Sequence, residues 1–237
     1  MYSPVEETVF IIATAIGSYL IGALPFGYII GRFKGVDIRQ YGSGNIGATN
    51  VTRVIGKGWG RLCFLLDFLK SALPVLVISY LSPKDILPNL VVLFPECLQH
   101  YSKIIPDDVG VLPVVAAFAA VCGHIWPIYL KFKGGKGVST AAGAILALNP
   151  LSLLCAGLTW VATFEISRYV SLASILAAVS LPVFCLLFKM IGWVNASVPE
   201  IILFFLLALL TVLKHQTNIK RLMQGTENRF ERKKGKN

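Results

Sequence analysis

Six long apolar runs constrain this chain more than any other feature of its sequence. Each approaches the roughly 20 apolar residues that an α-helix needs to cross a bilayer. The runs cover residues 8–30, 62–81, 110–130, 137–164, 170–191 and 199–214. Charged residues make up 14% of the 237 residues, whereas soluble domains carry roughly 25%. The sequence therefore predicts an all-α integral membrane protein.

The first run is expected to remain as a membrane helix and not to act as a cleavable signal peptide. Its flank carries Glu6 and Glu7, where a signal peptide has basic residues. The run is also too long for the apolar core of a signal peptide, and glycines and Pro25 interrupt it.

Basic residues predict which segments face the cytoplasm. Segments 31–57, 131–136 and 214–237 are rich in Lys and Arg. If the last two both lie inside, an even number of spans separates them. The run 137–164 then has to be two helices, and Asn149–Pro150 is a helix-ending dipeptide. This gives about seven spans, with the N-terminus outside and the C-terminus cytoplasmic, and six spans as the alternative.

The chain shows no internal repeat and no low-complexity linker, so we predict one helical domain over residues 1–237. Residues 214–237 form its basic cytoplasmic tail, and the polar segment 82–109 is predicted to be an external loop. The formal net charge is +10. A soluble nucleic-acid-binding protein can be this basic, but it does not devote its length to apolar runs. We therefore expect membrane lipid, and no nucleic acid, around this chain.

The first predicted inside loop has the composition of an anion site. It reads Gly42-Ser43-Gly44-Asn45-Ile46-Gly47-Ala48-Thr49-Asn50, and Arg53 follows. Glycines let the backbone approach a ligand, hydroxyls and N–H groups can bind an oxyanion, and Arg adds a bidentate fork. The alternative is a flexible glycine turn on the membrane face. The loop also fits G-x-G-x-x-G with Asp67 downstream, but the buried strand of a dinucleotide-binding fold does not precede it.

A second inside loop repeats this combination of glycine and cation. It reads Phe132-Lys133-Gly134-Gly135-Lys136-Gly137, and a predicted helix follows, whose N-terminus favours an anion. The glycine spacing and Gly137 exclude a Walker A motif. A purely cationic membrane anchor would explain the lysines but not the glycines.

A third polar element closes the last span. If it is helical, His215 and Asn218 are i, i+3 neighbours on one face, which Arg221 and Leu222 continue. A catalytic or phosphate-binding role and an interfacial anchor remain equally open from these residues alone.

Three further sets of polar residues receive structural interpretations. Asp67 and Lys70 are predicted to form a neutralising pair inside the second span, and His124 is expected to pack at the interface with Trp126. The five cysteines lack C-x-x-C spacing and are expected to form neither a disulfide nor a zinc site.

Neither a carboxylate pair nor a Ser-His-Asp or H-E-x-x-H pattern stands out, so no metal or protein nucleophile is indicated. The H-x-x-x-x-D signature of common glycerolipid acyltransferases is also absent.

The ordered motifs resemble the acyl-phosphate-dependent glycerol-3-phosphate acyltransferases of bacterial membranes, the PlsY family. The resemblance rests on Gly42–Arg53, Gly123–Pro127, Phe132–Val138 and the His215-x-x-Asn218 segment, and it extends over about residues 17–231. Thr217 and Ser71 differ from the residues common in the family at these positions, and we expect these differences to affect local packing more than activity. Glu227, in a terminal segment that also looks like the family, is expected to be structural.

The resemblance implies transfer of a fatty acyl group from acyl phosphate to the 1-hydroxyl of glycerol-3-phosphate, which gives lysophosphatidate and phosphate without a cofactor. It implies a site near the cytoplasmic face of the bacterial inner membrane. The implied catalytic residues are Ser43, Arg53, His215 and Asn218. The implied substrate-binding residues are Gly42, Gly44, Asn45, Gly47, Thr49, Asn50, Lys133, Gly134, Gly135, Lys136, Gly137 and Ser171. A transporter of a phosphorylated metabolite is the alternative, although its polar groups would gather near the bilayer midplane.

Overall fold

The computed structural model describes residues 4–80 and 111–230, and every regular element in these ranges is helical. The chain divides into two compact units, residues 1–148 (unit 1) and 149–237 (unit 2). Unit 1 contains α1 (Pro4–Gly22), α2 (Phe26–Phe33), η1 (Ile38–Gln40), α3 (Ala48–Val54), α4 (Lys57–Tyr80), α7 (Leu112–Ile125), η2 (Ile128–Leu130) and α8 (Val138–Leu148). Unit 2 contains α9 (Pro150–Ser167), α10 (Val170–Met190), α11 (Val198–Lys214) and α12 (Gln216–Met223). The all-α prediction is confirmed, and the single domain stays a prediction.

The predicted break within residues 137–164 is confirmed at Asn149–Pro150. The Asn149 side chain accepts a hydrogen bond from the Ser152 backbone N–H at 3.1 Å and so caps the start of α9. Pro150 occupies the first helical position, where its missing N–H costs nothing. The same two residues therefore end α8 and begin α9.

Among the described residues, five helical segments are long and apolar enough to cross a membrane, or six if the bent pair α11–α12 forms one span. The seventh predicted span corresponds to α8, which has only 11 residues. At 1.5 Å per residue, a helix of this length is about half as long as the bilayer core is thick. The sidedness of the spans stays a prediction, and the predicted loop 82–109 lies outside the described residues.

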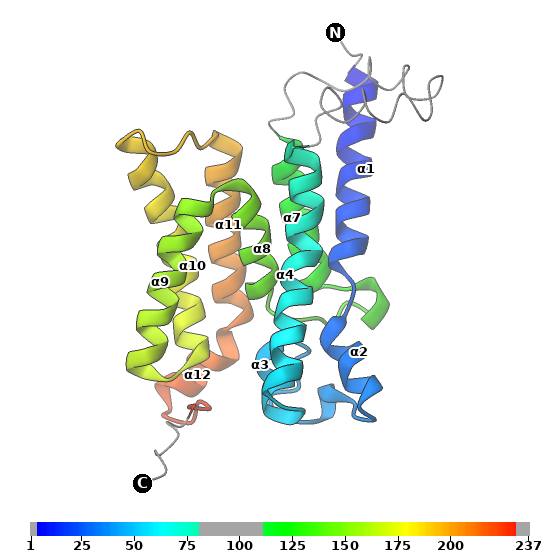
Figure 1. Cartoon of the computed structure of the whole chain (residues 1–237), viewed down its shortest axis with the longest axis vertical. Coiled ribbons are helices and arrows are strands. Elements are labelled where there is room, and N and C mark those ends of the chain that lie inside the picture. The colour runs from blue at the N-terminus through cyan, green and yellow to red at the C-terminus, as the bar shows by residue number, and fades with distance from the viewer. Residues whose placement is uncertain (1–3, 81–110, 231–237) are drawn as a thin grey trace. The chain divides into compact units, whose positions relative to one another are not determined.

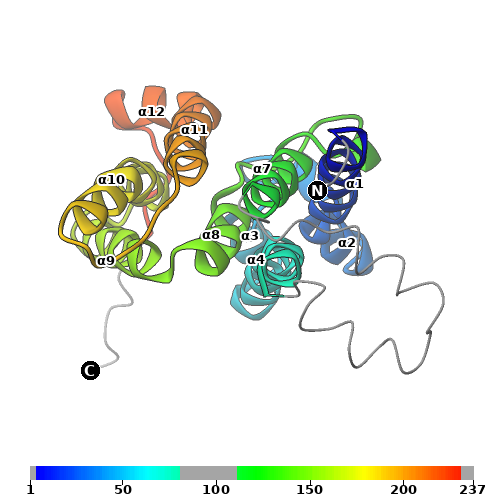
Figure 2. The same cartoon turned by 90° about the horizontal axis from the view of Figure 1, so that it is seen from above.

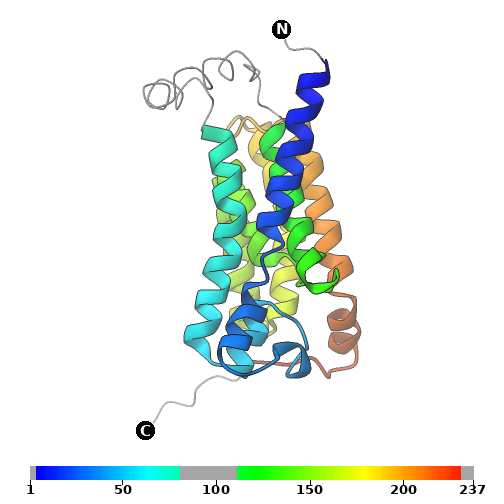
Figure 3. The same ribbon diagram turned by 90° about the vertical axis from the view of Figure 1, so that its right-hand side faces the viewer.

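The first apolar run is broken at Pro25, one of the residues that interrupt it in the sequence, although residues 8–33 together are long and apolar enough for one span. Residues 23–25 separate α1 from α2 because Pro25 cannot donate to the helical ladder. The break leaves the Leu24 carbonyl available, and the Lys70 ammonium donates to it at 2.8 Å. Figure 3 shows α2 beyond this break at the end of α1.

Unit 1 is assembled through glycines that let helix backbones approach closely. A Cβ at Gly123 would come within 2.7 Å of the Ala23 backbone nitrogen, where α7 packs on the end of α1. A Cβ at Gly143 would lie 2.6 Å from the Ser71 hydroxyl, where α8 packs on α4. That hydroxyl donates to the Thr140 carbonyl at 2.5 Å, so Ser71 joins the two helices. Figure 2 shows α1, α7, α4 and α8 side by side within this unit.

Unit 2 is built around α10, which packs against both α9 and α11. The α9 residues Leu154, Leu158 and Val161 are all more than half exposed and share one face at helical spacing. An apolar face of this kind is typical of a helix that contacts lipid. The chain then bends by 57° between α11 and α12. In Figure 1, α12 lies at the end of unit 2 where α9 finishes and α10 begins.

Candidate functional site

The first glycine loop, residues 41–50, is closed around the buried amide of Asn50. Its Oδ1 accepts a hydrogen bond from the Ser43 backbone N–H at 2.9 Å. Its Nδ2 donates to the carbonyls of Ile38, Tyr41 and Asn45 at 2.9–3.1 Å. Asn50 is 1% exposed, so its side chain shapes the loop from within.

The backbone of this loop needs its glycines. Gly42 and Gly44 have φ of 61° and 69°, in the left-handed region that glycine adopts without strain. A Cβ at Gly42 would also meet the Asn50 amide. Next along the chain, the Asn45 side chain accepts from the Gly47 N–H at 2.8 Å, just before α3 begins.

The predicted site residues of this first loop differ in their exposure to solvent. Ser43 and Gly44 are exposed, and so is Arg53 on α3. Gly47 and Thr49 are half-buried, while Asn50 lies beneath them. Within unit 1 the structure thus brings the residues of this motif into one loop and the helix that follows it.

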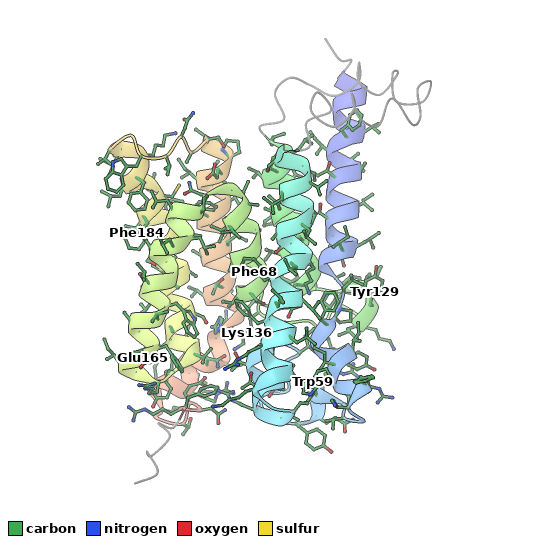
Figure 4. The ribbon with its side chains drawn as sticks, viewed as in Figure 1. Trp59, Phe68, Tyr129, Lys136, Glu165 and Phe184 are labelled. Carbon is green, nitrogen blue, oxygen red and sulfur yellow. The ribbon has the colours of Figure 1, made fainter. Side chains whose placement is uncertain are left out.

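The second loop, residues 131–137, is folded tightly against the last turn of α7. The Gly135 N–H donates to the His124 carbonyl at 3.0 Å. A Cβ at Gly134 would lie 2.8 Å from the Ile125 carbonyl oxygen, so these glycines allow the loop to approach the helix. Gly137 has a φ of 82° and leads into α8. Lys133 is exposed and Lys136 half-buried, and Figure 4 places Lys136 between the levels of Trp59 and Phe68 along α4.

Beneath this second loop lies a buried polar network that sequence reasoning recognised only in part. The predicted pair is confirmed, since the Lys70 ammonium lies 2.7 Å from Asp67 Oδ1. His124 belongs to this network, because it is 3% exposed and its Nδ1 lies 2.9 Å from the Lys70 Nζ. Nothing in the sequence indicates this contact, which joins residues 54 positions apart. The predicted position of His124 at the membrane interface stays a prediction.

In unit 2, one buried carboxylate accepts hydrogen bonds from three side chains of two helices. Glu227 Oε1 accepts from the Ser171 hydroxyl at 2.9 Å and from Asn218 Nδ2 at 2.6 Å. Glu227 Oε2 accepts from Arg221 Nε at 2.8 Å. Ser171 begins α10 and the other two donors lie on α12. Glu227 therefore fixes the orientation of Ser171 and Asn218, two residues of the predicted site, in keeping with its expected structural role.

The segment after α12 is held in place by the turn between α9 and α10. The Phe230 N–H donates to the Arg168 carbonyl at 3.0 Å, and Arg229 Nε donates to the Ser167 carbonyl at 3.2 Å. The Phe230 ring also meets the Phe164 ring edge-on at 5.9 Å. These contacts bring Glu227 back to the start of α10.

His215 lies at the bend between α11 and α12 and not inside one helix. Its Nδ1 lies 2.8 Å from the Thr211 carbonyl oxygen, which can only accept a hydrogen bond. Nδ1 therefore carries a proton, and in the neutral ring the lone pair belongs to Nε2. His215 and Asn218 are both buried.

Burial and hydrogen bonding act in opposite directions on the Glu227 carboxyl. Burial alone would raise its pKa, but the hydrogen bonds from Arg221, Asn218 and Ser171 outweigh burial and hold the pKa below its ordinary value of 4.5. A carboxyl with a depressed folded-state pKa stabilises the fold above its unfolded-state pKa. That stabilisation is lost as the pH falls through the folded-state value.

Asn50→Asp should lower the free energy of unfolding by about 3–5 kcal/mol, because a buried carboxylate would then face three carbonyl oxygens. Thermal unfolding in detergent and hydrogen exchange of residues 38–50 measure the effect. Asn45→Asp is the matched control, since Asp retains the acceptor for the Gly47 N–H. Equal losses in the two variants would contradict the role of the Asn50 amide as a donor to the loop.

Glu227→Gln should lower the Tm most at neutral pH, where the wild-type carboxylate accepts charge-assisted hydrogen bonds. The difference from wild type should narrow as the pH falls below about 4.5, where the unfolded chain takes up protons at this carboxyl, and it should disappear once the pH is below the lower pKa of the native carboxyl. Thermal unfolding between pH 3 and 8 measures it. Glu165→Gln, at an exposed ion pair on α9, is the control, and a Tm difference independent of pH would refute the assignment.

The chain matches known proteins over almost its whole length. A family model described as glycerol-3-phosphate acyltransferase covers residues 12–225. The glycerol-3-phosphate acyltransferase of Desulforamulus reducens is 45% identical over 220 residues, which are 92% of this chain and 94% of that protein. The corresponding protein of Acholeplasma laidlawii is 38% identical, over an alignment that covers 98% of this chain and 97% of that protein.

Two solved structures agree with these matches. The glycerol 3-phosphate form of PlsY, an integral membrane glycerol 3-phosphate acyltransferase, is 37% identical, with a TM-score of 0.74 over 93% of this chain and 96% of that one. Its lysophosphatidic acid form is 36% identical, with a TM-score of 0.72 over 93% of this chain and 95% of that one. This chain therefore belongs to the family of integral membrane glycerol-3-phosphate acyltransferases.

Proposed function

We propose that this glycerol-3-phosphate acyltransferase takes its acyl group from acyl phosphate and forms lysophosphatidate. The observation that carries the proposal is that both glycine loops and the His215-x-x-Asn218 segment occur together in a chain that matches PlsY over 93% of its length. Solved forms of PlsY are described with glycerol 3-phosphate and with lysophosphatidic acid. Membership of an acyltransferase family decides against the transporter alternative.

The reaction needs positioning more than covalent help from the protein. The glycerol-3-phosphate 1-hydroxyl oxygen attacks the acyl carbonyl carbon, the bond from that carbon to the phosphate oxygen breaks, and the hydroxyl proton leaves with the phosphate or passes through a base. Acyl phosphate is already an activated anhydride. The protein therefore has to hold two anions in register and stabilise the negative charge on the reacting oxygens.

In unit 1, the two loops supply the groups that such anions require. Ser43 and Arg53 are the proposed catalytic residues of the first loop and its helix, and both are exposed. Gly42, Gly44, Asn45, Gly47 and Thr49 are the proposed phosphate-binding residues of this loop, and Asn50 holds its backbone in shape.

The loop 133–137 is the proposed site for the phosphate of glycerol-3-phosphate. Lys133 and Lys136 supply its positive charge. Gly134, Gly135 and Gly137 let the backbone pass close to α7 and lead into the N-terminus of α8. An α8 N-terminus adds partial positive charge to this loop.

In unit 2, His215 and Asn218 are the proposed catalytic residues. Because Thr211 binds the Nδ1 side of His215, the Nε2 nitrogen is the one that can accept the glycerol hydroxyl proton or position that hydroxyl. The departing phosphate is the alternative base. Asn218 can hydrogen-bond an oxyanion or the leaving phosphate, and Ser171 and Glu227 orient its amide from below.

The enzyme is a multi-pass membrane protein, and the proposed setting is the bacterial cytoplasmic membrane. The basic segments 31–57, 131–136 and 214–237 support a site at the cytoplasmic face, with the N-terminus outside. Glycerol-3-phosphate is water-soluble and the acyl chain is not. An interfacial site would let each substrate arrive from its own phase.

Purified enzyme in detergent should convert acyl phosphate and glycerol-3-phosphate to lysophosphatidate and phosphate in equal amounts. Phosphate release and mass spectrometry of the lipid product measure the reaction. Acyl-CoA serves as the control donor and should give no product. Product from acyl-CoA but none from acyl phosphate would refute the proposed donor.

Lys136→Ala should raise the KM for glycerol-3-phosphate by about tenfold or more, because a charge-assisted hydrogen bond contributes roughly 1.5–3 kcal/mol. The KM for acyl phosphate should change by less than about twofold. Steady-state kinetics with each substrate varied in turn measure the two constants. Lys131→Ala removes a cation from the same loop and is the control; equal effects of both variants would show that only general charge matters.

A further inference from the structure

The Asp67–Lys70–His124 network contains a buried cation whose hydrogen-bonding capacity is completely used. An ammonium has three N–H donors and no acceptor. Lys70 Nζ lies 2.7 Å from Asp67 Oδ1, 2.8 Å from the Leu24 carbonyl oxygen and 2.9 Å from His124 Nδ1. The three residues are each at most 4% exposed. The position of the ammonium is therefore fixed by three segments of unit 1.

This geometry also decides the tautomer of His124. Toward an ammonium, which only donates, Nδ1 of His124 is the acceptor and the ring proton is then on Nε2. The same Nδ1 lies 3.5 Å from Asp67 Oδ1. Asp67 completes the arrangement from the other side, since its Oδ2 lies 3.6 Å from the Cys63 thiol. The imidazole ring thus has one orientation, set by Lys70.

The oriented ring lies directly under the second glycine loop. A Cβ at Gly135 would overlap Nε2 of His124 and lie 2.8 Å and 2.9 Å from the neighbouring ring carbons. The His124 carbonyl accepts the Gly135 N–H at 3.0 Å. His124 therefore contacts Gly135 twice, through its ring and through its backbone, one residue before Lys136.

We propose that Lys70 and His124 are positioning residues that set the loop 134–136 for the phosphate of glycerol-3-phosphate, and that Asp67 is the counter-ion of Lys70. This inference rests on the proposed role of that loop in substrate binding. The chain of contacts runs from the Asp67 carboxylate to the Lys70 ammonium, to the His124 ring and to the Gly135 backbone. None of the three side chains has to touch the substrate.

A neutralising ion pair alone would not require this arrangement. Buried ion pairs often contribute little net stability, because desolvation offsets their attraction. An Asp67–Lys70 pair would be complete with two groups on one helix. Lys70 also donates to the His124 ring on α7, and this ring packs against the loop that contains Gly135. Neutralising the Asp67 charge does not require this contact.

The test separates loss of stability from loss of positioning with two variants. Asp67→Asn removes only the counter-ion and keeps the Lys70 side chain in contact with His124, so it should lower the Tm but leave the Kd and KM for glycerol-3-phosphate within about twofold. The double variant Asp67→Asn/Lys70→Met leaves no unpaired buried charge, but the His124 ring loses its hydrogen bond from Lys70. It should raise both constants about tenfold, the usual effect of removing a buried support, while the KM for acyl phosphate stays within about twofold.

Binding of glycerol-3-phosphate without any donor, by isothermal titration calorimetry, measures Kd. Because this measurement does not involve transfer, a wrong acyl donor would not affect it. Glu165→Gln/Arg168→Met, which removes an exposed i, i+3 ion pair of α9, is the matched control. An unchanged Kd in the Lys70 variant, or an equal rise in the control, would overturn the proposal.

A second series covers the case in which the Asp67 variants do not fold. Gly135→Ala introduces a methyl group into the space of the His124 ring, and His124→Ala removes that ring. Each single variant should raise the KM for glycerol-3-phosphate about tenfold, and the double variant should raise it by less than the product of the two. Strictly multiplicative effects would show that ring and loop do not act together.

Discussion

The free-energy cost of placing polar groups in an apolar surrounding determines how this molecule holds its functional loops. Away from water, a neutral polar group without a hydrogen-bond partner raises the free energy of the fold by about 2–7 kcal/mol, and a lone charge raises it by more. Three buried polar side chains meet this constraint by collecting partners from different segments. Asn50 binds four backbone groups, Lys70 binds three acceptors, and Glu227 accepts from three donors. Each of them thereby fixes a segment that carries motif residues.

The glycines of both loops acquire two different physical explanations from these contacts. At Gly42 and Gly44 the backbone adopts a left-handed conformation that β-carbons disfavour. At Gly134 and Gly135 the backbone has an ordinary conformation, but α7 leaves no room for a side chain. A glycine-rich motif is thus not simply flexible. Its glycines allow a rigid, closely packed backbone, which is what a preorganised anion site requires.

Local chemistry decided which features could be predicted from the sequence. The helix break at Asn149–Pro150 follows from a capping side chain and a missing N–H within two residues, and the Asp67–Lys70 pair follows from i, i+3 spacing. The contact of His124 with Lys70 could not be predicted, because the two residues are 54 positions apart and no periodicity reports such a contact. The same Asn149–Pro150 dipeptide predicts where α8 ends. With 11 residues between Gly137 and the Asn149 cap, α8 is too short for a full span, although its apolar composition is that of a membrane segment.

Exposed motif residues in this protein are held in place by buried motif residues beneath them. A residue such as Ser43 can be exposed to a ligand only if its backbone is held by something beneath it, and here that is the Asn50 amide. Asn218 depends on Glu227 in the same way within unit 2. A motif read along the sequence does not distinguish a residue that meets the substrate from the one that holds it. The distinction matters for chemistry, because an amide or carboxylate that already holds its full set of partners orients reacting groups without itself exchanging protons with them.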